Sequence, residues 1–423
     1  MHIQPVILHA QNTFNNGSFM MLINLVWYYV KHAPEGTRIT FWVELDGAEN
    51  AERFRRAFPT GFLSGEVVEI RQLPLKITSV DHSSFLRKSV RLLGKFYGHP
   101  RTFKKLGIDS IILLGGDDIS EYYKKWMILS DLYRIRRYSK KFPTILAGQT
   151  IGPFKGLRER VAASCLSGTR IYTRDEPTVA YLKSRLRLDG KQVRSSADLC
   201  FPDLPLQKQD TGFLTSLGLE PDQYLALVPG GFYTLYTRDR QAYINAWTRL
   251  VKGLLDNPAY ERKQVVLLPH VTRPEDDREM TGAIYRNFPG SGENPKRLRR
   301  IDEELMPHQL RLILGNGHLT ISSRMHAALS TFQMGKPAIA LGYSVKYEGV
   351  IGTSLELPEL ILSCSADLIN DPEHFAFEVL NKTGYLEANY QLLTDRLKKR
   401  VPRLKTMAED QIREICLAAT AKG

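Results

Sequence analysis

The segment 322–326, SSRMH, contains the two side chains with the most distinctive chemistry in the sequence, Arg324 and His326. The planar guanidinium of arginine can bind a carboxylate or a phosphate through two parallel hydrogen bonds. Histidine is the side chain that most readily gives and takes a proton near neutral pH. We therefore predict that this segment handles an anion, although a histidine at the start of a helix is more often structural than catalytic.

Short polar or glycine-rich segments follow the expected strands in the first half of the chain. They are 15–18 (NNGS), 115–118 (GGDD), 148–153 (GQTIGP), 173–176 (TRDE) and 196–198 (SAD). Each alone is readily explained as a helix cap, a turn or a local ion pair. Because the carboxyl ends of strands in one open α/β sheet border one crevice, their joint position favours a binding site. None fits the dinucleotide pattern GxGxxG.

A second histidine, His270, follows an expected strand in the second half and could face the same cleft as His326. The nearby Asp276 and Asp277 could be a metal-binding pair. Two adjacent carboxylates before Arg278 are, however, more typical of the solvated start of a helix. We predict no metal site.

Two series of short apolar segments, alternating with helical patterns, are expected to position these residues. The first series predicts strands at Val6–Ala10, Ile39–Leu45, Val67–Arg71, Ser110–Leu114, Thr144–Ala147 and Arg170–Thr173. The second predicts strands at Leu225–Val228, Val265–Leu268, His318–Ile321 and Ala338–Leu341. The fold class is therefore α/β, with two Rossmann-like lobes facing a cleft.

Helix signals and a polar stretch set the expected boundaries. A helix after Ser18, with Ser18 as N-cap, and helices at Met306–Leu314 and Ala327–Met334 are the clearest. A polar, proline-containing stretch interrupts the pattern as a linker would. We expect an N-terminal lobe at 1–205, a linker at 206–222, a C-terminal lobe at 223–400 and a final helix at 401–423.

Composition bears on the binding partners and the cellular compartment of the protein, and not on its reaction. The net charge of +13 suits a polyanion, an anionic membrane or a negatively charged substrate. The four cysteines lack metal-ligand spacing, which favours a reducing cytoplasm, and no apolar run reaches the ~20 residues of a membrane span. The basic segment Phe85–Lys105 suits either an amphipathic helix on an anionic lipid surface or a solvated helix with one buried face.

Taken in order, these motifs resemble those of the polysaccharide pyruvyl transferase family. The resemblance is carried by the asparagine–glycine turn at 16–17, the glycine-rich loop at 115–116, GQTIGP at 148–153, the pairs 174–175 and 197–198, SSRMH at 322–326, GKP at 335–337 and YSVK at 343–346. Two departures, Asp117 in place of a third glycine and Ser18 in place of an aspartate, bear on acceptor recognition more than on reaction type.

The resemblance implies a fold similar to the two-lobed GT-B glycosyltransferases, with the acceptor on the N-terminal lobe and the donor on the C-terminal lobe. It implies transfer of pyruvate from phosphoenolpyruvate to two hydroxyls of a sugar, which gives a pyruvate ketal and phosphate. The acceptor would be a bacterial surface polysaccharide, such as an exopolysaccharide, or its lipid-linked precursor. Phosphoenolpyruvate is then the donor substrate, and no cofactor is expected.

Roles for individual residues follow from this resemblance. His326 and Arg324 are the candidate catalytic residues, because His326 could protonate the methylene carbon of phosphoenolpyruvate while Arg324 holds its carboxylate or phosphate. His270 is an alternative proton donor. The candidate substrate-binding residues are Asn16, Gly17, Gly116, Asp118, Gln149, Arg174, Asp198, His270, Ser323 and Lys346. Lys346, His270 and Arg174 suit the leaving phosphate, and Asp118 or Asp198 the sugar hydroxyls.

Two rival functions remain at this point. A GT-B glycosyltransferase with a nucleotide-sugar donor would share the fold, because fold alone does not determine function. A nucleic-acid-binding protein is suggested only by the net charge. The sequence has no RNP1 run, zinc-finger spacing or basic zipper, so we expect no nucleic-acid partner.

Overall fold

The computed structural model describes residues 1–63, 65–74, 99–121, 127–208, 212–288 and 297–420, which form two compact units. Unit 1 comprises Met1–Thr13, Ser18–Pro202 and Thr406–Gly423, and unit 2 comprises Phe14–Gly17 and Asp203–Lys405. The boundaries expected from the sequence assign residues 14–17 to the first lobe and 401–423 to neither lobe, so the observed units differ from them at both places.

Unit 1 contains an eight-stranded sheet in the order β1-β3-β2-β5-β6-β7-β8, with β4 beside β3, and its strand pairings are parallel. The strands are β1 (His2–Ile3), β2 (Pro5–Leu8), β3 (Arg38–Val43), β4 (Val68–Gln72), β5 (Ser110–Leu114), β6 (Thr144–Gln149), β7 (Arg170–Thr173) and β8 (Val193–Ser195). The apolar strand β5 is buried along its whole length, as is usual for a parallel strand covered on both faces.

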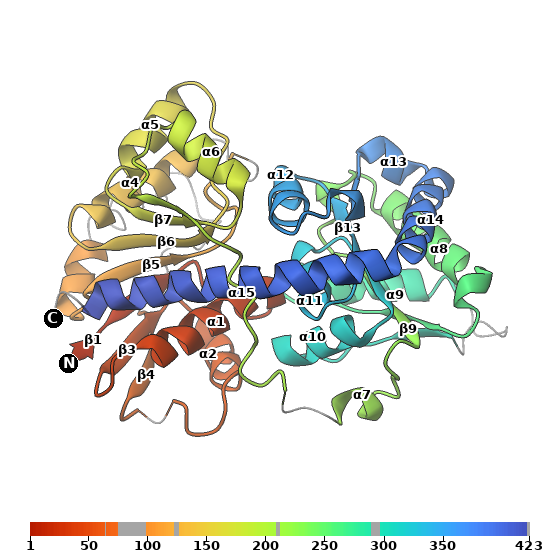
Figure 1. The fold of residues 1–423 in the computed structure, drawn as a ribbon, viewed down its shortest axis with the longest axis horizontal. Helices are drawn as coiled ribbons and strands as arrows, with labels where there is room; N and C mark the ends of the chain where they lie inside the picture. The colour runs from red at the N-terminus through yellow and green to blue at the C-terminus, as the bar shows by residue number, and fades with distance from the viewer. Residues whose placement is uncertain (64, 75–98, 122–126, 209–211, 289–296, 421–423) are drawn as a thin grey trace, which may run out of the picture. The chain divides into compact units, whose positions relative to one another are not determined.

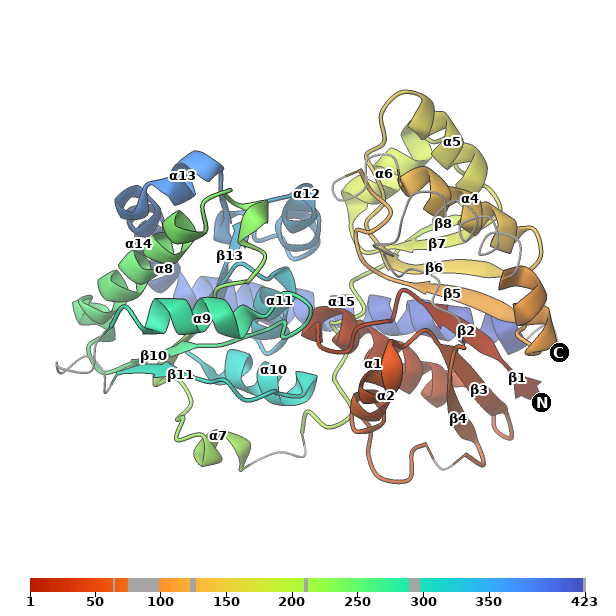
Figure 2. The same ribbon diagram turned by 180° about the vertical axis from the view of Figure 1, so that it is seen from behind.

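The helices of unit 1 pack on this sheet. They are α1 (Asn16–His32), whose first two residues belong to unit 2, α2 (Gly47–Arg55), α4 (Ile128–Ser139), α5 (Leu157–Leu166) and α6 (Glu176–Ser184). In Figures 1 and 2, α4, α5 and α6 lie beside β6 and β7, whereas α1 and α2 lie beside β3 and β4. Leu132 of α4 joins Leu146 and Ile171 in one buried apolar cluster, which fixes α4 on the sheet.

Unit 2 contains a six-stranded parallel sheet in the order β11-β10-β9-β12-β13-β14. Its strands are β9 (Tyr224–Val228), β10 (Gln264–Leu267), β11 (Leu298–Arg300), β12 (Leu319–Ser322), β13 (Ala338–Gly342) and β14 (Ile361–Ser363). Both β9 and β12 are fully buried at the centre of this sheet. The loops that follow β9, β10 and β12 therefore leave the sheet close to one another.

The helices of unit 2 surround its sheet. They are α7 (Phe213–Ser216), α8 (Arg240–Leu255), α9 (Asp277–Tyr285), α10 (Pro307–Asn316), α11 (Met325–Gln333), α12 (Val345–Tyr347), α13 (Ala366–Asn370), α14 (Pro372–Ala388) and the first half of α15 (Tyr390–Thr420), whose second half, from Thr406, belongs to unit 1. Short 3-10 helices lie at η1 (Tyr233–Leu235), η2 (Pro258–Tyr260) and η5 (Pro358–Leu360), and a π-helix lies at η4 (Glu348–Ser354). Helices α8 and α14 pack side by side in both views.

The two Rossmann-like α/β units confirm the predicted fold class. The short strands β1, β8, β11 and β14 were not predicted, and the other elements differ from the prediction at their ends. Strand β2 ends at Leu8, before the expected Ala10, because His9 adopts a left-handed φ of 63°. Helix α1 begins at Asn16, so Ser18 lies inside its first turn and is not the N-cap. Helix α11 begins at Met325, which places Arg324 at its N-cap.

Two expectations concern membranes. Among the described residues, no helix combines the length and the apolar character needed to cross a bilayer. The basic segment predicted over Phe85–Lys105 lies mostly outside the described residues, which omit 75–98.

Candidate functional site

Arg324 lies between the end of β12 and the start of α11 in unit 2. The Oγ of Ser322 accepts a hydrogen bond from the backbone N–H of Arg324 and donates one to its C=O, both at 2.9 Å. This small ring of hydrogen bonds replaces the strand pairing that ends at Ser322 and turns the chain into the helix. Arg324 is thus held at the carboxyl edge of a central strand, where ligands bind in open α/β sheets.

The guanidinium of Arg324 makes an ion pair with Asp277, whose side chain is fully buried. Nη2 of Arg324 lies 2.6 Å from Oδ1, and Nε lies 3.3 Å from Oδ2. Burial opposes the positive charge, but the charge and hydrogen bonds of Asp277 outweigh it and raise the pKa of Arg324. Arg324 therefore stays charged in a largely enclosed position.

Asp277 also accepts hydrogen bonds from three backbone N–H groups. Oδ1 accepts from Gly231 at 2.6 Å, and Oδ2 accepts from His270 at 3.0 Å and Val271 at 2.8 Å. The loops after β9 and β10 are thus tied to Arg324 through one carboxylate. Sequence reasoning missed this role and expected both aspartates to open a solvated helix.

That expectation is correct for Asp276 and wrong for Asp277. The side chain of Asp276 caps α9 by accepting from the N–H of Arg278. Adjacent residues on a helix point about 100° apart, so the carboxylate of Asp277 faces the sheet instead of solvent. No pattern in the single sequence distinguishes the two, because the difference is which side of α9 packs inward.

Ser323, a predicted substrate-binding residue, has its hydrogen bonds satisfied within unit 2. Its Oγ accepts from the N–H of Gly230 at 2.6 Å and donates to the C=O of Val228 at 3.2 Å. The hydroxyls of Tyr236 and Tyr347 both donate to the C=O of Ser323 at 2.9 Å. The residue therefore fixes the loop that carries Arg324.

His270 lies beside this ion pair and is almost completely buried, with 1% of its surface exposed. Within the described part of the chain, neither ring nitrogen has a hydrogen-bond partner. Burial lowers the pKa of His270 well below its usual value, and the positive charges of His326 and Arg324 lower it further. His270 is therefore neutral at neutral pH, which argues against it as the proton donor.

The predicted residues Asn16 and Gly17 belong to unit 2 and contact both histidines. The backbone N–H and the side-chain Nδ2 of Asn16 donate to the C=O of His270 at 3.3 and 2.9 Å. A Cβ on Gly17 would stand 2.3 Å from Nδ1 of His326, closer than atoms can approach. Asn16 holds the His270 loop, and only glycine at position 17 leaves room for the His326 ring.

Lys346 follows β13 in the same unit. Its Nζ donates to the hydroxyl of Tyr343 at 2.7 Å and lies 4.7 Å from the centre of that ring. The ring of Tyr347 is also within cation–π range, at 5.8 Å. Aromatic contacts thus hold this partly exposed ammonium group near the strand end.

The other predicted residues gather at the strand ends of unit 1. Arg174, after β7, is 1% exposed and donates from Nη1 to Asp198 at 2.8 Å and from Nε to Thr150 at 2.9 Å. Thr150 in turn donates to Asp175 at 2.7 Å. Burial opposes the charge of Arg174, but Asp198 and other nearby carboxylates raise its pKa. This network is buried and rigid.

Gln149 and Gly116 lie at neighbouring strand ends in unit 1. Nε2 of Gln149 donates to the C=O of Leu114 at 2.8 Å, and among the described residues its buried Oε1 has no partner. The C=O of Gly116 accepts from the N–H of Thr150 at 2.9 Å. The two predicted loops are therefore joined directly to each other.

Asp118 is 57% exposed, and its Oδ2 lies 3.7 Å from Nδ1 of His9. His9 was not predicted as a site residue, because its position falls inside the expected strand Val6–Ala10. The N–H of His9 donates to buried Glu44 at 3.0 Å. The structural signal that marks His9 is its positive φ at a strand end, which is unusual for a residue other than glycine. A sequence alone does not reveal this signal.

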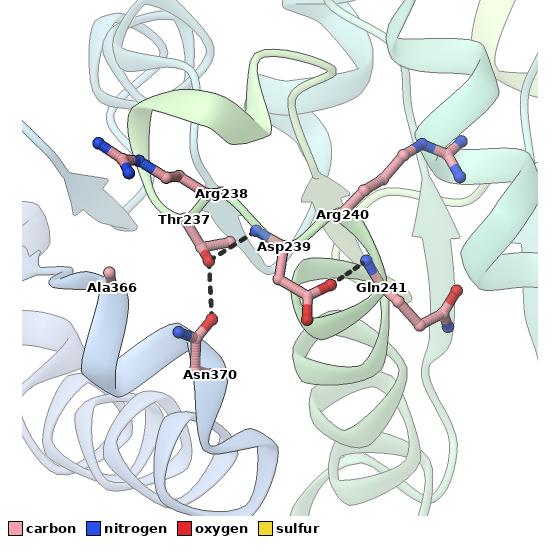
Figure 3. A pocket seen from close by; sticks show the side chains of 7 residues that line it. All are labelled: Thr237, Arg238, Asp239, Arg240, Gln241, Ala366 and Asn370. Atoms are coloured by element: carbon pink, nitrogen blue, oxygen red, sulfur yellow. Dashed lines mark hydrogen bonds between the residues drawn. The ribbon is translucent and has the colours of Figure 1, made fainter.

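A separate cavity of about 590 Å³ in unit 2 is lined by Thr237, Arg238, Asp239, Arg240, Gln241, Ala366 and Asn370. In Figure 3 the two arginine side chains point away from each other. The carboxylate of Asp239 already accepts the first free N–H groups of α8. None of the predicted residues lines this cavity, and it lacks the converging cations of an anion site.

Two Rossmann-like units, each built on a parallel sheet, are the architecture of one fold class, the GT-B fold. Structures of this class resemble the chain over its whole length. UDP-GlcNAc 2-epimerase from Neisseria meningitidis, bound to UDP-GlcNAc, matches with a TM-score of 0.59 and 9% identity over 100% of both chains. A glycosyltransferase from Rickettsia africae matches with a TM-score of 0.53 and 9% identity, covering 100% of this chain and 99% of the other.

The family is narrower than this fold class. A family model described as polysaccharide pyruvyl transferase matches residues 62–345, well over half of the chain, and the chain belongs to that family. The protein is thus a transferase whose family implies a saccharide acceptor. The matched region contains Arg324, His326, His270 and Asp277, so the arrangement around the ion pair lies within it.

Proposed function

We propose that this protein transfers pyruvate from phosphoenolpyruvate to a sugar of a bacterial surface polysaccharide, or of its lipid-linked precursor, to form a pyruvate ketal. The observation that supports this most is the half-buried, permanently charged Arg324, which is paired with fully buried Asp277 and precedes His326 by two residues at a central strand end. A cation fixed in a low-dielectric position attracts a small multiply charged anion such as phosphoenolpyruvate strongly.

The chemistry divides into two additions at C2 of the donor. Protonated His326 gives its proton to the methylene carbon, which becomes a methyl group and leaves an oxocarbenium-like C2. One sugar hydroxyl attacks C2 and returns its proton to His326. The C2–O bond to phosphate then breaks, the second hydroxyl attacks, and its proton leaves with the phosphate. Donor and two hydroxyls thus yield one ketal and one inorganic phosphate.

Arg324 holds the donor in this proposal, through either its carboxylate or its phosphate. Lys346 is a further cation for the phosphate, and neutral His270 can offer it a hydrogen bond. In unit 1 we assign Asp118 to sugar hydroxyls because it is exposed. Gly116, Gln149, Arg174 and Asp198 shape that strand edge through hydrogen bonds, in which Thr150 connects Gly116 to Arg174.

The direct test is phosphate release from phosphoenolpyruvate with a panel of saccharide acceptors. His326→Ala should lose about 10²- to 10⁴-fold in turnover, the usual contribution of a positioned general acid. His374→Ala, which alters an exposed histidine on α14, is the matched control and should keep full activity. Near-normal turnover in His326→Ala would remove histidine from the mechanism.

Donor identity is tested separately, by ligand-induced stabilisation. Phosphoenolpyruvate should raise the melting temperature, because a ligand that binds only the folded state stabilises it. A rise with a nucleotide sugar and none with phosphoenolpyruvate would instead indicate a glycosyltransferase.

We also propose that the acceptor can be lipid-linked and that the basic segment Phe85–Lys105 brings the protein to an anionic membrane surface. Co-sedimentation with vesicles containing anionic lipid tests this. Charge reversal at Lys88, Arg91 and Lys95 should abolish the binding, and unchanged binding would contradict it.

A further inference from the structure

A guanidinium group has two edges that can each hold a pair of oxygen atoms. One edge is formed by Nε and Nη2, and the other by Nη1 and Nη2. In Arg324 the first edge is occupied, because Nε and Nη2 both donate to the carboxylate of Asp277. Within the described part of the chain, Nη1 of Arg324 donates to no protein acceptor.

The position of the guanidinium is restricted from the other side as well. A Cβ on Gly230 would lie 2.8 Å from Nε of Arg324, so the loop after β9 passes directly against the side chain. A Cβ on Gly231 would lie 3.3 Å from Oδ1 of Asp277. The segment 229–231, PGG, can enclose the ion pair only because it carries no side chains at these two positions.

We propose that Asp277 is a positioning residue of the donor site, which fixes Arg324 so that its Nη1–Nη2 edge receives two oxygens of the donor anion. This inference rests on the proposed function for the identity of the donor. It goes beyond that function because it assigns a role to a carboxylate that does not touch the substrate. It also identifies the edge of Arg324 that the donor uses.

Asp277 also sets the position of His270, because it accepts the backbone N–H of that residue at 3.0 Å. The ring of His270 is buried, and its nitrogens have no partner among the described residues. A buried polar group without a partner is costly, and a ligand that provides the missing hydrogen bond recovers that cost. Asp277 thus positions two hydrogen-bond donors for the same anion, the charged guanidinium of Arg324 and the neutral ring of His270.

The test compares substitutions at two adjacent aspartates. Asp277→Asn removes the charge and places an N–H₂ group among donors, and Asp277→Glu keeps the charge but moves the guanidinium by about one carbon–carbon bond. Both should raise KM for phosphoenolpyruvate and lower kcat/KM by about 10²-fold, with KM for the saccharide unchanged. Asp276→Asn is the matched control, because asparagine caps a helix as well as aspartate does, and its kinetics should equal wild type.

A double substitution separates positioning from general structural damage. The ammonium group of lysine lacks the two edges of a guanidinium group. Adding Asp277→Asn to Arg324→Lys should therefore lower kcat/KM no further. Melting temperatures identify any variant that fails to fold. If Asp277→Asn fails to fold, Asp277→Glu takes its place in the comparison. Losses that multiply in the double variant, or a normal KM for phosphoenolpyruvate in both Asp277 variants, would overturn the proposal.

Anion binding by the wild-type protein keeps this inference distinct from the proposed function. Inorganic phosphate and pyruvate serve as probes, with melting temperature as the readout. If they stabilise the wild type but not Asp277→Asn, while phosphoenolpyruvate is not turned over, the positioning role holds and the proposed reaction fails. If neither probe nor phosphoenolpyruvate stabilises the wild type, both proposals fail.

Discussion

Substituting Gly17 by alanine should displace His326 without removing it. The new Cβ would stand 2.3 Å from Nδ1, 2.7 Å from Cγ and 2.9 Å from Cβ of that histidine. An ordinary contact begins near 3.4 Å, so the ring has to move by about 1.1 Å, the difference between 3.4 and 2.3 Å. A misplacement of about 1 Å in a reacting group can cost about 10²-fold in rate, and we expect that loss in kcat.

The stability of the same variant should fall moderately. Overpacking costs about 1–3 kcal/mol, and replacing a helical glycine by alanine returns about 0.5–1 kcal/mol. The net loss should therefore not exceed about 2.5 kcal/mol. Urea unfolding measures this loss, and steady-state phosphate release measures kcat.

Gly384→Ala is the matched control. Gly384 lies on α14, and a Cβ added there would meet no atom within 4 Å. This variant should gain about 0.5–1 kcal/mol and keep wild-type kcat. In a His326→Ala background, Gly17→Ala should lower kcat no further, because the ring is gone and only the Cβ of residue 326, at 2.9 Å, remains close to the new methyl group. Wild-type kcat in Gly17→Ala alone would refute the reasoning that the position of this ring governs the rate.

Three further predictions concern the charged groups. Because burial lowers the pKa of His270, the unfolded chain takes up a proton below about pH 6.5 and the folded protein does not, so stability falls by about 1.4 kcal/mol per pH unit as the pH drops. His270→Gln should flatten a melting-temperature profile between pH 7 and pH 5. An unchanged slope would contradict this prediction. Arg174→Ala removes the buried guanidinium that pairs with buried Asp198 and should destabilise by about 3–5 kcal/mol, whereas Arg185→Ala at an exposed pair should cost much less in the same urea titration. Chelation with EDTA should leave turnover intact, since we predict no metal, and loss of activity restored by a divalent cation would show that prediction to be wrong.

Strands and strand-end motifs were predictable because they depend on local patterns. The run 111–114, IILL, is short and apolar, begins with two β-branched residues and lies between Ser110 and Gly115, and it forms β5 at the expected place. The segment 322–326 combines an arginine and a histidine with a strand and a helix, and both residues lie at that junction. Periodicity and residue type suffice for such features.

The partners of these residues were not predictable, because they depend on which surfaces pack together. Asp277 and Asp276 are the same residue type at adjacent positions, yet one holds Arg324 and the other caps a helix. Likewise Gly17 fits an ordinary helix-start glycine until the ring of His326 is placed against it. Only the tertiary structure separates these alternatives.

The membership of residues 14–17 in unit 2 has a consequence for how this protein folds. The hydrogen bond from Asn16 to the C=O of His270 joins residues 254 positions apart in the chain. Contacts of such high sequence separation form late, because their loop-closure entropy must be met before they contribute stability. During synthesis, the segment around Gly17 leaves the ribosome long before His270 and His326 exist to bind it. The arginine–histidine site can therefore be completed only after the chain has been made as far as His326.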